Sequence, residues 1–276
     1  MTDAIAAADR DYVLGTHDDE IARLGLQHTV WRPRALGAWQ RAGFNVGQTI
    51  IDVGSGPGYA TLDLAELVGA GGRVIAVDRS RRFLDTLEAG RRARGIDNVT
   101  VVESDLDDAT FDASVANGAW CRWVLAFVQR PRDLLARIAG ALKPGGVFVS
   151  HEYFEYASWR AVPRSPLFEE FVSATIANWR ASGGEPDIGL EVPRWLEELG
   201  FEIESTRTLI DVISPRDYMW QWPKSFMEIG LKRLVTLGAI EVGKARIIEE
   251  ELERVGNSPD MRMITPGVLE VIARKR

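Results

Sequence analysis

Short apolar runs and longer amphipathic stretches alternate along most of this chain. From residue 49 onwards the apolar runs tend to end in Gly or Asp, and the segments between them carry apolar residues at helical spacing. This alternation is typical of βαβ units, whose strands pair in parallel. The first predicted strands are residues 49–53, 73–77, 99–103, 115–121 and 146–151. The pattern therefore predicts a parallel sheet with helices between its strands.

The segments between these strands have the features of helices. Residues 60–68 place their apolar side chains on one face, and Ser80 can cap a second helix that runs through Leu87. A third helix is predicted at 132–142. It should end at the sequence KPGG (143–146), because proline and glycine stop a helix and turn the chain into the next strand.

The rest of the chain extends this pattern on both sides, with two interruptions. We expect a helix at 192–199 and further strands at 201–213 and 261–274. The predicted fold is α/β: a doubly wound, mostly parallel seven-stranded sheet with N-terminal helices and an inserted, mainly helical lid. The predicted divisions are an N-terminal helical preface at 1–44, a core at 45–152, a lid or substrate region at 153–190 and 214–260, and the remainder of the core sheet at 191–213 and 261–276.

Composition narrows the class of protein. Apolar residues make up 46% of the chain and charged residues 26%, as in ordinary globular domains. A net charge of -7 disfavours nucleic acid as a partner, and the absence of an apolar run of about 20 residues predicts no membrane span. With Cys121 as its single cysteine and no basic-then-apolar leader, the chain is expected in the cytoplasm.

The strongest chemical signal is the sequence IIDVGSGPG (50–58), an apolar strand that ends in a glycine-rich turn and opens a helix. Glycines permit positive φ and add no Cβ, so a ligand can approach the backbone closely. The following helix offers unpaired N–H groups to an anionic group. The dinucleotide fingerprint requires a further glycine where this chain has Tyr59, which weighs against a nicotinamide-dependent oxidoreductase.

Glycines at 54, 56 and 58 after Asp52 resemble the first motif of the class I, Rossmann-like S-adenosylmethionine-dependent methyltransferases of the small-molecule type. The resemblance continues through residues 47–152. It implies that Asp78, at the end of the second strand, binds both ribose hydroxyls, and that Asp105 accepts a hydrogen bond from the adenine amino group. The KPGG sequence is similar to the family's turn before its fifth strand.

This resemblance implies a set of ligand contacts for S-adenosylmethionine and its product S-adenosylhomocysteine. Arg122, at the end of the fourth strand, is a candidate to hold a carboxylate of cofactor or substrate, although a surface salt bridge explains it as well. The cofactor-binding candidates are Tyr12, Arg32, Asp52, Gly54, Ser55, Gly56, Gly58, Asp78, Arg79, Ser104, Asp105, Leu106, Cys121 and Arg122.

The chemistry of methyl transfer asks little of the protein beyond positioning and exclusion of water. A general base matters only for a protonated acceptor, and His151 or Glu152, just past the fifth strand, is best placed for that role. Cys121 has no evident histidine partner to make it a nucleophile, and the histidines lack metal-ligand spacing, so no metal is expected.

The two predicted lid segments are rich in aromatic residues. They are expected to pack together as a cap that suits a small, partly apolar or aromatic acceptor. A homodimer interface built from the same aromatics is the alternative. For the protein as a whole, the alternative to a methyltransferase is a non-catalytic cofactor-binding module, because methyl transfer needs no diagnostic catalytic residue.

Overall fold

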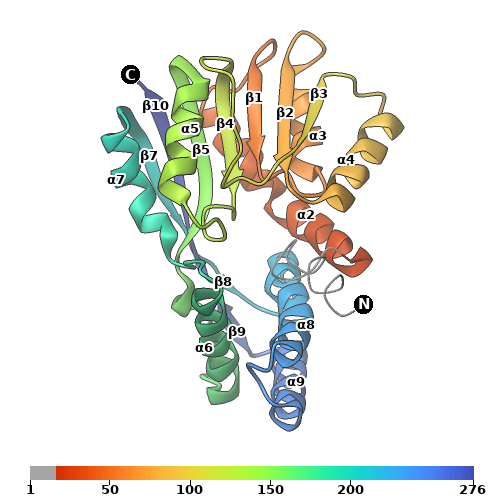
Figure 1. Cartoon of the computed structure of the whole chain (residues 1–276). Coiled ribbons are helices and arrows are strands. Elements are labelled where there is room, and N and C mark those ends of the chain that lie inside the picture. The colour runs from red at the N-terminus through yellow and green to blue at the C-terminus, as the bar shows by residue number, and fades with distance from the viewer. Residues whose placement is uncertain (1–16) are drawn as a thin grey trace, which may run out of the picture.

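The computed structural model describes residues 17–276, so Tyr12 lies outside the described residues. Its main sheet has seven strands in the order β3-β2-β1-β4-β5-β10-β7 (Figure 1). The first five strands in this order pair in parallel, and β10 runs antiparallel to both β5 and β7. The predicted doubly wound, mostly parallel sheet is confirmed.

The main-sheet strands match the apolar runs of the sequence. Their bounds are β1 Thr49–Val53, β2 Arg73–Asp78, β3 Val99–Glu103, β4 Ala116–Arg122, β5 Leu142–Glu155, β7 Phe201–Leu209 and β10 Gly267–Lys275. In the sheet interior β1 is buried from its second residue to its last, as expected for a strand covered on both faces.

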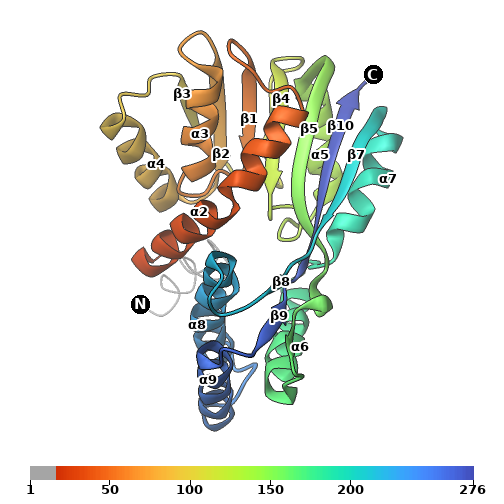
Figure 2. The ribbon, with the colours of Figure 1, turned by 180° about the vertical axis from the view of Figure 1, so that it is seen from behind.

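Helices cover both faces of this sheet. α2 (Asp18–Arg41), α3 (Tyr59–Val68) and α4 (Arg81–Ala93) lie on the face toward the viewer in Figure 2. α5 (Pro131–Ala141) and α7 (Glu191–Glu198) lie on the other face, toward the viewer in Figure 1. Ser80 caps α4 as predicted, accepting a hydrogen bond from Phe83 N through its hydroxyl.

The two interruptions of the βα pattern come together beneath the sheet. They form α6 (Pro166–Ala181), α8 (Gln221–Thr236) and α9 (Val242–Asn257), which pack against one another below the carboxyl ends of the strands (Figure 1). A second, three-stranded sheet joins this lobe to the core in the order β6-β9-β8. Its strands are β6 Arg160–Val162, β8 Val212–Ile213 and β9 Arg262–Ile264, and short 3-10 turns occur at Tyr156–Ser158, Ile188–Leu190 and Tyr218–Trp220.

The structure corrects the bounds of four predicted strands, two of them because of the second sheet. The predicted strands at 201–213 and 261–274 each divide into one strand of the main sheet and one of the small sheet. β5 is longer at both ends than predicted, and the KPGG sequence lies inside its first residues, with Gly145 at φ 77°. β4 begins after Ser114 at φ 52° and has an irregular register between Ala116 and Gly118. Apolar periodicity does not report which of two sheets a strand joins, because both offer buried faces.

The sheet order decides where a ligand can bind. β1 lies between β2 and β4, so the chain direction across the sheet reverses beside β1. In open α/β sheets, ligands bind outside the carboxyl ends of the strands at this switch point.

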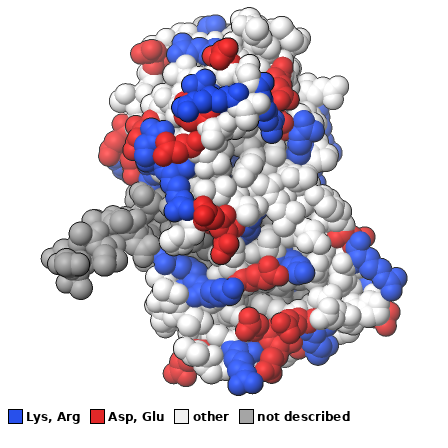
Figure 3. Space-filling view, turned by 90° about the vertical axis from the view of Figure 1, so that its right-hand side faces the viewer, with Lys and Arg blue, Asp and Glu red and all other residues white. Residues whose placement is uncertain are grey.

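No helix within residues 17–276 is long and apolar enough to cross a membrane. Acidic and basic side chains are interspersed on the face shown in Figure 3.

Candidate functional site

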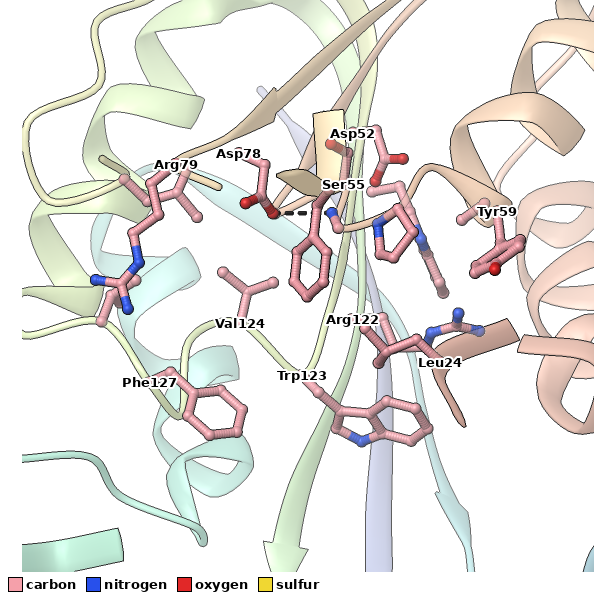
Figure 4. A pocket seen from close by; sticks show the side chains of 18 of the residues that line it. Leu24, Asp52, Ser55, Tyr59, Asp78, Arg79, Arg122, Trp123, Val124 and Phe127 are labelled. Carbon is pink, nitrogen blue, oxygen red and sulfur yellow. Dashed lines mark hydrogen bonds between the residues drawn. The ribbon is translucent and has the colours of Figure 1, made fainter. Parts of the chain in front are cut away.

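A pocket opens at the carboxyl ends of β1, β2 and β4, beside the start of α3. Figure 4 shows Asp78 and Arg79 at one end of it and Arg122 and Tyr59 at the other. The residues that line it are Leu24, Gln27, His28, Asp52, Gly54, Ser55, Gly56, Pro57, Tyr59, Ala60, Asp78, Arg79, Phe83, Asp105, Leu106, Asp107, Trp120, Arg122, Trp123, Val124, Phe127 and Val128.

The glycine-rich loop forms one wall of the pocket. Gly54 and Ser55 donate backbone hydrogen bonds to Val77 O at 2.9 and 3.0 Å, which ties the loop to the end of β2. Gly56 has φ 53°, and a Cβ built on it would meet no atom of residues 17–276 within 4 Å. A Cβ on Gly54 would instead stand 2.4 Å from Val124 Cγ2. Gly56 therefore leaves open space beside the pocket, whereas Gly54 is needed for packing within the protein.

Asp78 holds this loop from the end of β2. Its Oδ2 accepts from Gly56 N at 2.8 Å, and its Oδ1 accepts from Ser80 N at 2.9 Å. Burial raises the pKa of Asp78, and the hydrogen bonds from these backbone N–H groups oppose that rise. Each carboxylate oxygen has a further lone pair, so Asp78 can still accept from a ligand diol.

Asp52 lies deeper, at the end of β1. Its side chain is buried, and Oδ2 accepts from Thr61 Oγ1 at 2.6 Å. Burial raises the pKa of Asp52 to about 6, and Arg122 opposes that rise through its positive charge. Asp52 pairs with Trp120 in the β1–β4 register, so Asp52, Trp120 and Arg122 share one face of the sheet.

The loop after β4 forms the opposite wall and is built around Glu152. Trp123 adopts φ 53°, which is uncommon for a bulky residue and costs about 1 kcal/mol or more. The next two backbone N–H groups, of Val124 and Leu125, donate to Glu152 Oε1 at 2.9 and 3.0 Å. Burial raises the pKa of Glu152 to about 7. This carboxyl group fixes the strained loop that brings Trp123 and Val124 to the pocket.

The structure brings nine of the predicted cofactor-binding residues to the pocket: Asp52, Gly54, Ser55, Gly56, Asp78, Arg79, Asp105, Leu106 and Arg122. Four others do not line it. Gly58 caps α3 and faces Leu87, and Ser104 bonds its own neighbour. Cys121 is fully buried with its Sγ 3.6 Å from Glu152 Oε1, and Arg32 donates to Asp63 Oδ2 at 2.7 Å.

The two candidate general bases also lie outside the pocket lining. His151 is fully buried, with Nε2 3.0 Å from Glu270 Oε2, and burial lowers the pKa of its imidazole. Glu152 is 1% exposed and serves the loop after β4. Both were predicted to lie at or just past the end of the fifth strand, but β5 continues through Glu155 and keeps them inside the sheet. Neither side chain therefore reaches the pocket, and neither is assigned the role of a general base.

Several pocket residues were not predicted from the sequence. Leu24, Gln27 and His28 come from α2, and Trp123, Phe127 and Val128 from the loop after β4. The aromatics of the lid do not line the pocket; Tyr153 and Trp222 stack on Trp123 from behind, with ring centroids 5.4 and 5.7 Å away. The heptad-like spacing of Leu24, Gln27, His28 and Trp31 on α2 was the available signal that this helix has a buried face.

Known proteins resemble this chain in sequence and in fold. Residues 51–150 match the methyltransferase-domain family. Residues 51–150 of this chain therefore form a methyltransferase domain. Over 103 residues it is 42% identical to a cypemycin N-terminal methyltransferase from Streptomyces sp, a match that covers 36% of this chain and 40% of that protein. It is 24% identical over 184 residues to a demethylmenaquinone methyltransferase from Lactococcus lactis, covering 66% and 69% of the two chains.

A solved structure has a similar fold. The crystal structure of a putative methyltransferase from Bacillus halodurans superposes with a TM-score of 0.60 at 17% identity, covering 87% of this chain and 98% of that one. Identity at this level shows a shared fold. The cofactor of this methyltransferase domain is S-adenosylmethionine.

The polar atoms of the pocket fit that cofactor. Ser55 Oγ and Arg122 Nη1 are buried at the pocket and have no hydrogen-bond partner within residues 17–276. Gly56 leaves a backbone surface that no described side chain covers. Buried polar groups without partners are costly, so these atoms mark where a polar ligand completes the site. Among the described residues no cluster of His, Cys, Asp and Glu could hold a metal ion.

Proposed function

We propose that this protein transfers the methyl group of S-adenosylmethionine directly to a small, partly apolar or aromatic acceptor. The observation that carries the proposal is the two-sided pocket: Asp78 and the glycine loop on one wall, and the apolar side chains of Trp123, Val124 and Phe127 on the other (Figure 4). One wall provides hydrogen bonds for a nucleoside, and the other shields a reacting centre from water.

The residues of this chain would act by binding and orientation. Asp78 would accept from the ribose hydroxyls while it holds Gly56 N, and Asp105 would lie beside the adenine. When bound, the cofactor supplies a sulfonium whose methyl carbon is attacked in line by a lone pair of the acceptor, and the electrons of the broken bond remain on sulfur. Trp123, fixed through the Glu152 hydrogen bonds to the next two residues, would hold the acceptor side of the pocket rigid.

The relatives suggest the first acceptors to test. One is a cypemycin N-terminal methyltransferase and another is a demethylmenaquinone methyltransferase, and the chain covers 40% and 69% of these two proteins. The family match covers residues 51–150, and the α2 residues that line the pocket lie outside it. We therefore treat acceptor choice as open within small molecules that have an apolar or aromatic portion.

The decisive experiment measures S-adenosylhomocysteine formation with S-adenosylmethionine and a library of phenols, quinols, amines and short peptides, with products identified by mass spectrometry. Asp78→Ala, whose cofactor binding should be weakened, serves as the low-activity control. Faster formation of a methylated product by wild type than by this control supports the proposal. Tight S-adenosylhomocysteine binding without any acceptor turnover would favour a non-catalytic cofactor-binding module. Calorimetric preference for NAD would favour an oxidoreductase instead.

A further inference from the structure

His28 of α2 is hydrogen-bonded through both ring nitrogens. Its Nδ1 is 3.1 Å from Arg122 Nη2, and its Nε2 is 3.0 Å from Asp63 Oδ2. A guanidinium nitrogen can only donate, so Nδ1 must be the acceptor and the ring proton must be on Nε2, from which it is donated to Asp63. Both contacts can form together only when His28 is neutral, and burial lowers the pKa of His28, which favours that state.

Asp63 is itself held by a second donor. Arg32 Nε donates to the same Oδ2 atom at 2.7 Å, and the Asp63 side chain is only 6% exposed. Arg32, Asp63, His28 and Arg122 therefore form a continuous chain of hydrogen bonds from the surface of α2 to the pocket. This chain fixes the His28 tautomer, because the negative oxygen of Asp63 favours the proton on Nε2.

Arg122 ends this chain inside the pocket. Its guanidinium carbon lies 5.3 Å from the ring centroid of Trp123 and 5.8 Å from that of Trp120, and Nη2 is engaged by His28. Nη1 is buried and has no hydrogen-bond partner within residues 17–276. Burial lowers the pKa of Arg122 to about 10, so the group remains charged at neutral pH. A buried cation with an unused donor is expensive unless an anion completes it.

The position of Arg122 indicates which anion that is. It lies at the end of the pocket opposite Asp78 (Figure 4). A cofactor whose ribose is held at Asp78 and whose chain extends along the pocket presents its amino-acid portion at the far end. Asp52 shares the sheet face of Arg122, so the two side chains offer opposite charges to the ammonium and carboxylate of that portion.

We propose that His28 is a positioning residue that holds Arg122 where its Nη1 binds the carboxylate of the cofactor. The inference rests on the proposed function, because it assigns part of the same pocket to the same cofactor. His28 acts through Arg122 and does not touch the carboxylate itself. Its neutral Nδ1 leaves the guanidinium with one oriented donor, which a flexible arginine without this acceptor would lack.

The test compares two ligands that differ only at this end. S-adenosylhomocysteine carries the ammonium and carboxylate, whereas 5′-methylthioadenosine retains the nucleoside and sulfur but lacks both charged groups. Calorimetry gives Kd for each ligand on wild type, Arg122→Met, His28→Asn and His28→Gln. The Asn amide oxygen can occupy the place of Nδ1 and accept from Arg122, whereas the longer Gln amide occupies the place of Nε2 and faces Asp63.

We expect Arg122→Met and His28→Gln to weaken S-adenosylhomocysteine binding about tenfold to a hundredfold, the range for one charge-assisted hydrogen bond. Binding of 5′-methylthioadenosine should change by less than about twofold, which is within the range of a minor surface effect. His28→Asn should keep most of the wild-type preference for S-adenosylhomocysteine. If His28 has only a structural role, His28→Gln should lower the melting temperature or weaken the binding of both ligands by the same factor. Either result would overturn the proposal.

Two other outcomes are also decisive. If S-adenosylhomocysteine affinity survives in Arg122→Met, the guanidinium does not bind the cofactor carboxylate and the proposal is wrong, although the proposed function stands. If wild type binds neither ligand, the proposed function itself fails. Because the two failures give different wild-type results, they cannot be confused.

A pH series provides a second readout. Protonation of His28 would place an N–H opposite Arg122 Nη2 and remove the acceptor, so the preference for S-adenosylhomocysteine should decline toward acid pH. The groups around His28 are Asp63 and Tyr59 on α3, Arg32 on its own helix and Arg122 on β4. Burial also raises the pKa of Asp52 to about 6, which adds a pH dependence that we expect wild type and His28→Asn to share. A preference that falls identically in both would contradict a role for His28.

Discussion

The backbone N–H of Gly56 donates to Asp78 Oδ2 at 2.8 Å, which joins the glycine loop after β1 to the acid that ends β2. Two sequence motifs 22 residues apart therefore form one structural unit. A side chain that was predicted only to bind ribose also sets the shape of the loop against which the cofactor lies. Substitutions at either position must be read with both roles in mind.

Asp78→Ala should weaken S-adenosylhomocysteine binding by about 1.5 to 3 kcal/mol, because it removes charge-assisted acceptors for the ligand and unpairs Gly56 N. Calorimetry measures the loss. Glu103→Ala is the matched control: it deletes an exposed carboxylate at the end of the neighbouring strand, outside the pocket. An unchanged Kd in a well-folded Asp78→Ala protein would show that Asp78 only accepts backbone hydrogen bonds and does not bind the ligand.

Gly56→Ala should abolish or strongly weaken cofactor binding. Its new Cβ would meet no atom of the described residues within 4 Å, so the methyl group would project into the space where a ligand approaches the loop. Gly95→Ala is the control, because Gly95 also has a positive φ of 65° and nothing within 4 Å, and it lies outside the pocket lining. Both variants should lose about 1 kcal/mol of stability from backbone strain. Equal ligand affinity in the two variants would refute a ligand role for Gly56.

Glu152→Gln should flatten the dependence of stability on pH. The pKa of Glu152 is about 7 in the folded protein, above the value of about 4.3 in an unfolded chain. The folded state therefore binds this proton more tightly, and the stability that results is present below about pH 4 and lost as the pH rises through 7. Gln keeps an oxygen for the N–H groups of Val124 and Leu125 but does not titrate.

Urea unfolding from pH 5 to 8 provides the measurement. The free energy of unfolding of wild type should fall more steeply than that of Glu152→Gln, by at most about 1.4 kcal/mol per pH unit. Glu155→Gln, an exposed position near the end of the same strand, should follow wild type. Parallel curves for wild type and Glu152→Gln would mean that Glu152 does not titrate in this range.

The lid should become more protected from hydrogen exchange when the cofactor site is filled. Trp123 lines the pocket and stacks on Trp222 of α8, with their ring centroids 5.7 Å apart. A ligand that restricts the motion of Trp123 should therefore also restrict the motion of α8. With S-adenosylhomocysteine, protection should rise at 54–58 and at 221–236, whereas α7, on the far face of the sheet, should not change. If only the glycine loop responded and dilution deprotected the lid, the lid would be an oligomer interface.

The core of the fold could be predicted because its signals are local. Apolar runs of one strand length, the cap at Ser80 and the glycine turn after Asp52 are each determined by residues close in sequence. The division of the later strands between two sheets could not be predicted, because it depends on which strand, distant in sequence, pairs with each segment. The lid aromatics were predicted to adjoin the acceptor, but in the structure they support Trp123 from outside the pocket.

The sheet, the glycine loop and the acids at 52, 78 and 105 could be predicted from the sequence, because strand periodicity and the order of motifs place all of them at one edge of a parallel sheet. Which polar groups are already engaged in hydrogen bonds depends on how the helices and strands pack. From their place in the sequence, His151 and Glu152 were predicted to lie at the carboxyl edge of the sheet. In the structure they are buried, His151 against Glu270 and Glu152 against the loop after β4. His28 shows no motif, yet α2 crosses the sheet and brings it to Arg122. Such pairings join residues far apart in the chain, and only the packing of a helix on a sheet decides which of them meet.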